Sequence, residues 1–301
     1  MGAIKSISSI FRYINHHPLA GKHKLQAYYK FFRWQITSRI FKGPHRVPFV
    51  GDTVLVADRS MKGATGNIYL GLHDFSEMSF VLHFLRPDDC FFDVGANVGS
   101  YSVLAAGVAR AKAFSFEPVP QTFRSLERNV KENDLQTFVN CVNAGVGAKE
   151  EMLYFTSLND SVNHVVSEGS ISDFTKVVKV PIVKLDDYAS GPAHAILIKI
   201  DVEGFETEVL NGMPLLLQNQ ALKGIIIELN GSGSRYGYDE NDIHAHLLHN
   251  GFEPYNYDPY SRGLEKQSTF GKFNTIYLRD VDFIKERLQN SPKAEVFSER
   301  F

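Results

Sequence analysis

The chain has 301 residues, of which 44% are apolar and 22% charged, so it can bury one large core or two modest ones. Its two cysteines, Cys90 and Cys141, exclude a disulfide framework and a cysteine-based zinc site. No run of about 18 apolar residues is present, so we expect no membrane-spanning helix. The opening sequence MGAIKSISSIF lacks the apolar core of a secretory leader, and we therefore expect a cytoplasmic protein.

The formal net charge of -2 hides an uneven distribution. The first 51 residues contain nine of the 32 lysines and arginines and none of the 34 acidic residues. Within them, residues 22–41 predict an amphipathic helix, because apolar side chains recur at steps of three and four. We expect this stripe to pack on the rest of the chain or on a second copy, as in a homo-oligomer. The alternative is that the basic head recruits an anionic acceptor or contacts a membrane surface. The stripe consists of Leu25, Tyr28, Tyr29, Phe32, Ile36 and Ile40.

The composition divides the chain into three predicted segments. Residues 1–46 form a basic, aromatic, helical extension, residues 47–88 a strand-rich lead-in, and residues 89–301 the main domain. In the main domain strands alternate with helices, which predicts an α/β fold with a mostly parallel central sheet and helices on both faces. The last two strands lack a helix between them, which indicates one antiparallel edge strand. The predicted strands are 90–94, 113–116, 138–144, 195–200, 225–228, 252–257 and 275–278, and the helices 80–85, 99–109, 122–133, 206–217 and 240–249.

Two features interrupt the alternation of strands and helices. The short alternating runs 152–155 and 177–183 predict a hairpin rather than a parallel crossover. Between them, the polar and serine-rich segment 157–176 predicts a mobile loop.

The sequence CFFDVGANVGSYSVLAA places a glycine-bearing turn between a buried strand and a helix. A dinucleotide-binding loop would need glycines at positions 95, 97 and 100, and only Gly95 matches. The pattern Asp-x-Gly-x-x-x-Gly is instead typical of an S-adenosylmethionine loop, in which glycines let the backbone approach the ligand. Asp93 would accept hydrogen bonds from the cationic end of the ligand's methionine part. The loop residues that we expect to bind cofactor are Asp93, Gly95, Ala96, Asn97, Gly99 and Ser100.

A further acidic residue ends the next predicted strand. Glu117 follows Gly99 by 18 positions and lies in the sequence FEPVP. A carboxylate at this place can accept hydrogen bonds from both ribose hydroxyls of a nucleoside cofactor. We therefore add Glu117 and Pro118 to the predicted cofactor site, against the alternative that they only mark the end of a strand.

Acidic residues also follow the buried strand 195–200, where a charge is costly unless it is paired or used. Asp201 and Glu203 come directly after this strand, and Glu228 ends the next one. Such carboxylates can orient an acceptor hydroxyl, act as a general base or hold a divalent cation, although nothing in the sequence requires a metal. Glu206 is more simply explained as the acidic opening of a helix.

The blocks DVGANVGSYS, FEPVP, LDDY, KIDVEGFE and VLNG, in this order, resemble the FkbM family of S-adenosylmethionine-dependent methyltransferases over roughly residues 70–280. The segments HPLAGKHKL, FFRWQ, GATGNIYLGLHDF, LHFLRP, NHV and NTIYLR are similar to a long bacterial subgroup of that family. The resemblance implies a class I Rossmann-like methyltransferase domain that methylates hydroxyls of sugars, glycans or other secondary metabolites. It also implies that Asp93, Gly95, Asn97, Gly99 and Glu117 bind the cofactor and that Asp201, Glu203 and Glu228 line the transfer site.

Methyl transfer to a hydroxyl needs an aligned acceptor and a group that removes the hydroxyl proton. We take Asp201 as the first candidate for this base and His164 as the second. His244, His246 and His249 do not all share one helix face, so we predict no metal site there. Two other functions stay open. One is an RNA methyltransferase that uses the basic head, although the acidic body does not favour a nucleic-acid partner, and the other is a non-catalytic S-adenosylmethionine-binding scaffold.

Overall fold

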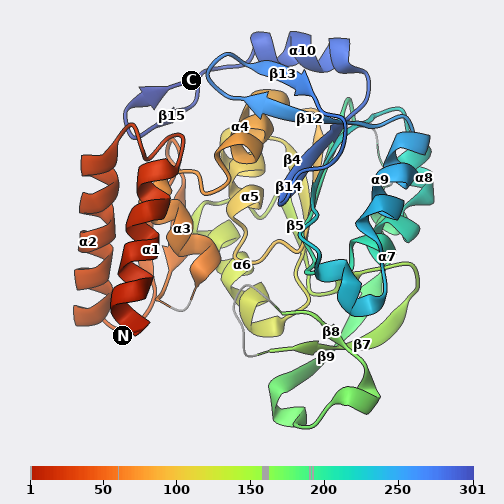
Figure 1. Ribbon diagram of the computed structural model, residues 1–301, viewed down its shortest axis with the longest axis horizontal. Coiled ribbons are helices and arrows are strands. Elements are labelled where there is room, and N and C mark those ends of the chain that lie inside the picture. Colours follow the sequence, from red (N-terminus) through yellow and green to blue (C-terminus); the bar gives the residue numbers. More distant parts are fainter. Residues whose placement is uncertain (1, 60, 158–162, 190, 192) are drawn as a thin grey trace.

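The computed structural model spans residues 1–301 and describes residues 2–59, 61–157, 163–189, 191 and 193–301. Residues 158–162 of the predicted loop lie outside this description. A central α/β unit carries the N-terminal helices along one side and a small second sheet at one end (Figure 1). The main sheet, which positions the site described below, follows from the buried apolar runs of the sequence.

The main sheet has eight strands, and five of them, β5, β4, β3, β10 and β11, run parallel to their neighbours in this group. The chain enters at β3 in the middle, continues to β4 and β5 on one side, and then crosses to β10 and β11 on the other. The carboxyl ends of β3 and β10 therefore form a topological switch point, where open α/β sheets bind their ligands. The strand order is β13 (Gly263–Lys266), β12 (Glu253–Asp258), β14 (Asn274–Leu278), β11 (Leu222–Glu228), β10 (Ile196–Ile200), β3 (Cys90–Val94), β4 (Lys112–Phe116), β5 (Val139–Val142).

The predicted α/β class with a mostly parallel sheet is confirmed, and the structure adds detail at the C-terminal end. The edge strand is β13, which is antiparallel to β12 and was not among the predicted strands, so the expectation that the last predicted pair supplies the edge is wrong. In addition, β14 is inserted between β11 and β12 and is antiparallel to both. This order and direction are those of a class I Rossmann-like methyltransferase sheet.

Helices cover both faces of the sheet, because successive side chains of the central strands point to opposite sides. On one face, Phe91 and Leu197 pack with α4 (Phe75–Phe84), α5 (Ser100–Val103), α6 (Pro120–Glu132) and α10 (Val281–Gln289). On the other, Phe92 and Ile198 pack with α7 (Glu206–Asn211), α8 (Pro214–Gln218) and α9 (Glu240–His249). The predicted helix 99–109 is α5 continued by the π-helical segment Leu104–Val108.

The N-terminal part contains α1 (Gly2–His16), α2 (Lys24–Ile40), the hairpin of β1 (His45–Pro48) and β2 (Val54–Ala57), and α3 (Lys62–Leu70). The prediction of a strand-rich lead-in over 47–88 is wrong beyond the hairpin, since α3 and α4 fill most of the remainder. Two glycines, Gly63 and Gly66, weaken the helical pattern of α3, and tertiary packing overrides this low propensity. The domain boundaries drawn from composition stay a prediction.

The helix predicted over 22–41 is present as α2, but most of the predicted apolar stripe faces solvent, and the opposite side of the helix is buried. Phe31 and Trp34 point inward with Ala27 and Ser38, whereas most of the predicted stripe is exposed. The reason is that α2 has apolar residues on two opposite faces, and periodicity alone cannot choose between them. The fold buries the face that carries Trp34 together with the small residues Ala27 and Ser38, which permit close packing.

A four-stranded second sheet has the order β6 (Gly145–Val146), β9 (Val177–Val183), β7 (Glu151–Thr156), β8 (Val165–Val166), and β7 and β9 form the predicted antiparallel pair. Part of the predicted loop 157–176 is therefore strand β8, which pairs with β7. Near the C-terminus, β15 (Glu295–Val296) and β16 (Glu299–Arg300) form a hairpin whose Glu299 lies 2.7 Å from His23, just before α2. Among the described helices, none has the length and apolar character needed to cross a bilayer.

Candidate active site

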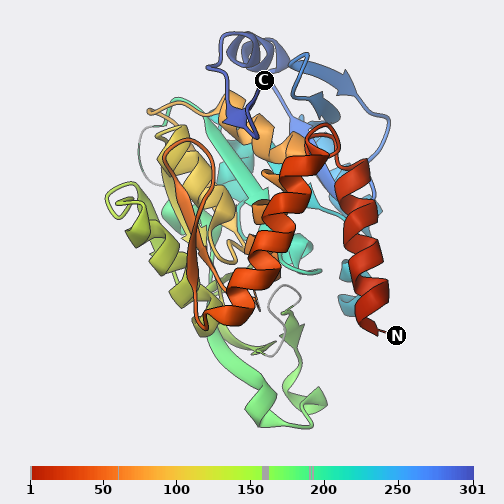
Figure 2. The same cartoon turned by 90° about the vertical axis from the view of Figure 1, so that its left-hand side faces the viewer.

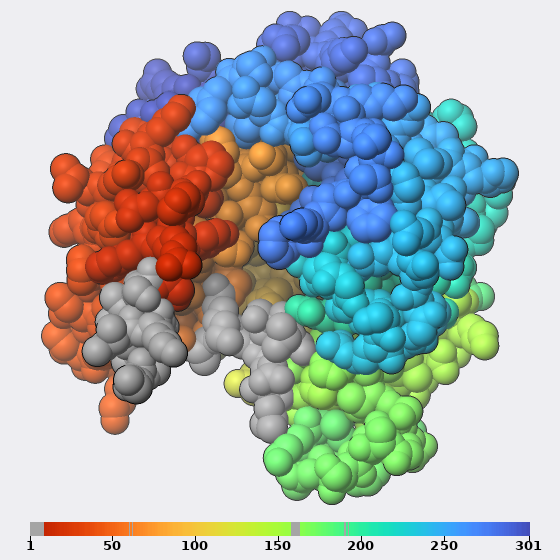
Figure 3. Space-filling model, in the orientation of Figure 1, coloured from red at the N-terminus to blue at the C-terminus, as the bar shows by residue number. Residues whose placement is uncertain are grey.

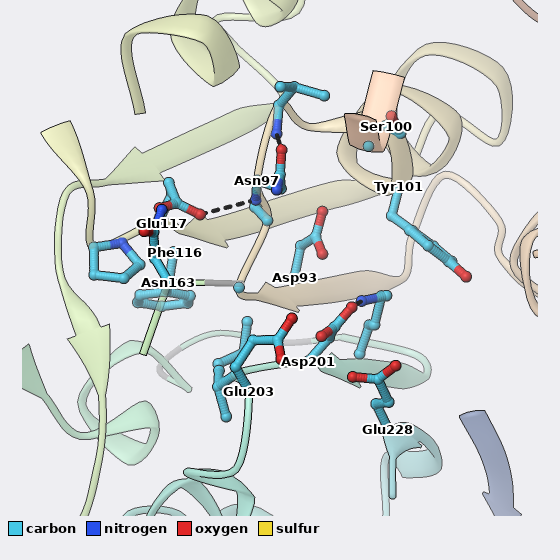
Figure 4. Close-up of a pocket in the computed structure, with 18 of the residues that line it drawn as sticks. Asp93, Asn97, Ser100, Tyr101, Phe116, Glu117, Asn163, Asp201, Glu203 and Glu228 are labelled. Carbon is cyan, nitrogen blue, oxygen red and sulfur yellow. Dashed lines mark hydrogen bonds and ion pairs between the residues drawn. The ribbon is translucent and has the colours of Figure 1, made fainter. Parts of the chain in front are cut away.

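A pocket of about 290 Å³ lies at the carboxyl ends of β3, β4, β10 and β11. Figure 3 shows this face of the molecule hollowed between the N-terminal helices and the C-terminal part of the chain. One wall is the turn after β3, and the opposite wall comes from the ends of β10 and β11 (Figure 4). The pocket thus lies at the switch point that the strand order defines.

The glycine-bearing turn is shaped by its neighbours in the sheet. Gly95 has a φ of +80°, and a Cβ on it would lie 1.9 Å from the carbonyl oxygen of Asp201. Gly99 has a φ of +86°, and a Cβ there would lie 2.6 Å from Leu126 Cδ1. The two glycines therefore allow the turn to pack closely against β10 and α6. Of the predicted loop residues, Gly99 is the one that does not line the pocket.

Glu117, at the end of β4, fixes the turn after β3 from the other side. One carboxylate oxygen accepts the backbone N–H of Asn97 at 3.0 Å, and the other accepts the N–H of Val119 at 2.9 Å. Figure 4 shows Glu117 directed toward Asn97 across the pocket edge. Glu117 and Pro118 both line the pocket, so the two predicted cofactor segments are brought together.

A buried lysine lies below the acidic residues of the pocket. Lys199 is paired in register with Asp93 across β10 and β3, and both side chains are almost fully buried. Its Nζ donates to Asp201 Oδ2 at 2.9 Å. Burial lowers the pKa of Lys199, but Asp201 and Asp93 outweigh burial and raise the pKa above its ordinary value. Sequence reasoning missed Lys199, although a charged residue inside the apolar run ILIKI was the signal for it.

Asp93 is held at the floor of the pocket. Burial raises the pKa of this carboxyl, while the charge of Lys199 and a hydrogen bond from Ser102 counteract the shift. Ser102 Oγ donates to Asp93 Oδ2 at 2.6 Å. Asp93 is thus a fixed acidic group that faces the pocket from β3.

Three carboxyl groups meet at the ends of β10 and β11. Asp201, Glu203 and Glu228 each offer an oxygen, and these oxygens lie within 4.8 Å of one another (Figure 4). Burial raises the pKa of Glu228 to about 8, and the nearby Asp201 and Glu203 add to the shift. Burial likewise raises the pKa of Glu203 to about 7, with contributions from Asp201 and Glu206. Two carboxyls with near-neutral pKa values are suited to proton transfer, and we assign no metal to the group.

Two other predicted residues lie away from the pocket lining. Glu206 is buried at the start of α7, where its Oε1 accepts the N–H of Gly204 at 3.1 Å and of Val202 at 3.3 Å. It therefore shapes the turn after β10, in agreement with the prediction that it opens a helix. In the segment after residue 162, Asn163 lines the pocket while His164 does not. The backbone of His164 pairs with Thr156 on β7.

Sequence reasoning missed the wall that α3 and α4 contribute. Asp74, before α4, accepts a hydrogen bond from the hydroxyl of Tyr101 at 3.0 Å, and both residues line the pocket. Two buried polar atoms of the lining, Ser100 Oγ and Asn274 Oδ1, have no hydrogen-bond partner among the described residues. Unpartnered polar atoms that face a pocket are places where a bound ligand can supply the missing hydrogen bond.

A family model described as "Methyltransferase FkbM domain" matches residues 93–254, which is more than half of the chain. The chain belongs to the FkbM methyltransferase family. The matched range begins at Asp93 and extends past Glu228, so it includes the glycine-bearing turn and all three clustered carboxyls. The resemblance seen in the sequence is thereby confirmed.

Curated relatives match over part of their length. Hexuronic acid methyltransferase AglP of Haloferax volcanii is 29% identical over 161 residues, which cover 52% of this chain and 61% of the relative. The 31-O-demethyl-FK506 methyltransferase FkbM of Streptomyces tacrolimicus is 27% identical over 163 residues, which cover 43% of this chain and 61% of that protein. The matches thus span about three fifths of these relatives.

Solved structures show only a distant likeness. Precorrin-6y C5,15-methyltransferase from Geobacter metallireducens has 12% identity and a TM-score of 0.40, and the match covers 76% of this chain and 95% of that one. TrmK of M. capricolum, solved with S-adenosylhomocysteine, has 10% identity and a TM-score of 0.37, with 68% of each chain covered. The fold assignment therefore rests on the strand order described above.

The cofactor of this FkbM-family chain is S-adenosylmethionine, and the pocket residues fit its charges. Six carboxyl groups and a single lysine are found among the described lining residues. Such a lining attracts a ligand that carries a sulfonium and an ammonium group, and it would repel a pyrophosphate. The unpartnered Ser100 Oγ and the carboxylate of Glu117 provide polar contacts at the turn after β3.

Proposed function

We propose that this FkbM-family protein transfers a methyl group from S-adenosylmethionine to a hydroxyl of a sugar, glycan or other secondary metabolite. The observation that carries the proposal is the convergence of Asp201, Glu203 and Glu228 within 4.8 Å of one another, in the pocket lined by the glycine-bearing turn. The names of two relatives support the class of acceptor, since one acts on a hexuronic acid and the other on a 31-O-demethyl compound.

We assign cofactor binding to the residues around β3 and β4. S-adenosylmethionine supplies a methyl group on a positively charged sulfur. Glu117 would accept hydrogen bonds from the ribose hydroxyls, because it directly follows β4 and lies against the turn after β3. Asp93 would face the cationic methionine part from the pocket floor, and Ser100 Oγ would take a hydrogen bond that the protein leaves unmade.

Glu228 is our choice for the base. As the acceptor oxygen forms its bond to the methyl carbon and the carbon–sulfur bond breaks, Glu228 accepts the hydroxyl proton. Its pKa, raised by burial to about 8, makes it a stronger base than an ordinary carboxylate. Asp201, the first candidate from sequence, is tied to Lys199 at 2.9 Å, and this ion pair suits a fixed charge that orients the acceptor. Glu203 faces the same place and would share that positioning role.

The test measures transfer of an isotope-labelled methyl group to a panel of uronic acids, neutral sugars and tRNA. Glu228→Gln should lower kcat by about 100-fold or more, the size expected for loss of a general base, while binding of S-adenosylhomocysteine is preserved. Glu208→Gln is the matched control, because Glu208 is a partly buried glutamate of α7 that lies outside the pocket lining and accepts a hydrogen bond from Tyr238, and its kcat should stay near that of the unaltered protein. An equal rate for Glu228→Gln would remove Glu228 as the base, and methylation of tRNA alone would overturn the proposed acceptor class.

A further inference from the structure

The outward side of α2 carries a row of exposed apolar side chains. We call this row the outer α2 face. Its exposed fractions run from 50% for Phe32 to 88% for Leu25. Half of the twelve large exposed apolar side chains among the described residues belong to the range 25–41. The outer α2 face consists of Leu25, Tyr29, Phe32, Ile36 and Ile40.

The arrangement of these residues makes a continuous surface. Steps of four, three, four and four residues keep them within about 80° of helix circumference. This arc lies opposite the buried side of α2, which includes Phe31 and Trp34. Figure 2 shows α2 in front of the molecule with α1 beside it. Phe11 of α1 contacts Phe32 edge-on, with 6.0 Å between the ring centroids, and Phe32 still keeps 50% of its surface exposed. Single exposed apolar residues are ordinary, but an uninterrupted row on one helix is typical of an interaction site.

Positive charges border the row. Arg33 and Arg39 lie on either side of it, and Lys24 and Lys42 lie at its two ends, all of them exposed. No acidic residue occurs before Asp52. An apolar row with a rim of lysine and arginine is the pattern of a helix that lies in the interface of an anionic bilayer.

We propose that the outer α2 face docks this protein on an anionic lipid surface. The apolar side chains would enter the boundary between headgroups and acyl chains, and the four rim charges would contact lipid phosphates. Symmetric pairing of α2 with a second copy is disfavoured by charge, because Arg33 and Arg39 would meet the same residues across the contact and neither helix supplies an acid. An anionic membrane supplies the opposite charge that such a dimer lacks.

Vesicle flotation of the full chain tests the proposal, with vesicles of phosphatidylcholine alone or with about one third phosphatidylglycerol. Binding to the anionic vesicles is expected, and it should weaken as salt concentration rises. Ile36→Ser with Ile40→Ser should lower the affinity by about tenfold or more through lost apolar burial. Arg33→Glu with Arg39→Glu should lower it by about 25-fold or more, and this second variant leaves the apolar row intact.

The matched control is Leu215→Ser with Leu248→Ser, which removes two exposed leucines from other helices and should leave vesicle binding unchanged. Circular dichroism and sedimentation accompany each variant. Equal binding to both kinds of vesicle, or unchanged binding by the α2 variants, would overturn the proposal. A dimer that the Ile36 and Ile40 variant dissociates, without any vesicle binding, would also overturn it and would assign the face to a second copy.

Discussion

The substitution Gly95→Ala tests whether the turn after β3 is shaped by its contact with β10. A Cβ at residue 95 would lie 1.9 Å from the carbonyl oxygen of Asp201, whereas real Cβ contacts stay above 3.0 Å. The two backbones would have to separate by about 1 Å, which strains the hydrogen bonds from Gly95 N–H to Phe116 O and from Asp201 N–H to Val94 O.

The expected cost has three parts. A left-handed φ on a residue with a Cβ costs about 1–2 kcal/mol, a weakened buried hydrogen bond about 1 kcal/mol, and the backbone shift about 1–3 kcal/mol. The free energy of unfolding, measured by urea denaturation, should therefore fall by about 3–6 kcal/mol. Binding of S-adenosylhomocysteine should weaken as well, because the shift displaces the turn after β3, which lines the proposed cofactor pocket.

Gly251→Ala provides the matched control. Gly251 has a φ of +81°, almost that of Gly95, but a Cβ there would meet nothing within 4 Å. The free energy of unfolding of Gly251→Ala should fall only by the cost of a left-handed φ, about 1–2 kcal/mol, and this variant should bind S-adenosylhomocysteine normally. If Gly95→Ala lost no more stability than Gly251→Ala, the argument from close approach would be refuted.

Three further substitutions separate binding, pH dependence and folding. Glu117→Gln replaces a carboxylate oxygen that accepts a backbone N–H. Titration calorimetry should show that the affinity for S-adenosylhomocysteine falls by about tenfold to a hundredfold. An unchanged affinity would argue against the proposed contact with the ribose. Burial raises the pKa of Glu206 to about 7, so the folded chain keeps a proton that the unfolded chain releases, and stability falls as pH rises from about 4.5 to 7. Glu206→Gln should remove up to about 3 kcal/mol of that fall in pH-dependent denaturation, and identical pH curves would contradict this. Asp89→Asn breaks the buried ion pair with Arg287 at the amino end of β3, opposite the pocket, and should cost about 3–5 kcal/mol of unfolding free energy with ligand affinity preserved.

Most of the main sheet was predictable from the sequence, because its central strands are continuous apolar runs bounded by turns. The run ILIKI and the run IIIE fold as the adjacent parallel strands β10 and β11. The strand β13 was not predicted, since GLEK is short and polar and forms only by pairing with β12. The helix α3 was missed for a related reason, because its glycines hide a helix that tertiary contacts stabilise.

Five of the six acidic residues of the pocket were predictable, because each lies at or shortly after the carboxyl end of a strand of the main sheet, whereas Asp74, before α4, was missed. The different roles that we propose for Asp201 and Glu228 were not predictable. The pairing of Asp201 with Lys199 and the burial of Glu228 depend on neighbours that a single sequence does not place. The sequence also did not determine which face of α2 is buried, since its two apolar faces have the same period and only packing against the main domain selects one.

Titration of the full chain with S-adenosylhomocysteine is the most direct test of the cofactor site on which the proposed function rests, because it depends on the pocket and not on the identity of the acceptor. The predicted result is one molecule bound per chain, with affinity lowered in Glu117→Gln and preserved in Glu228→Gln. Absence of binding, or binding that Glu117→Gln leaves untouched, would contradict the assignment of this pocket to S-adenosylmethionine.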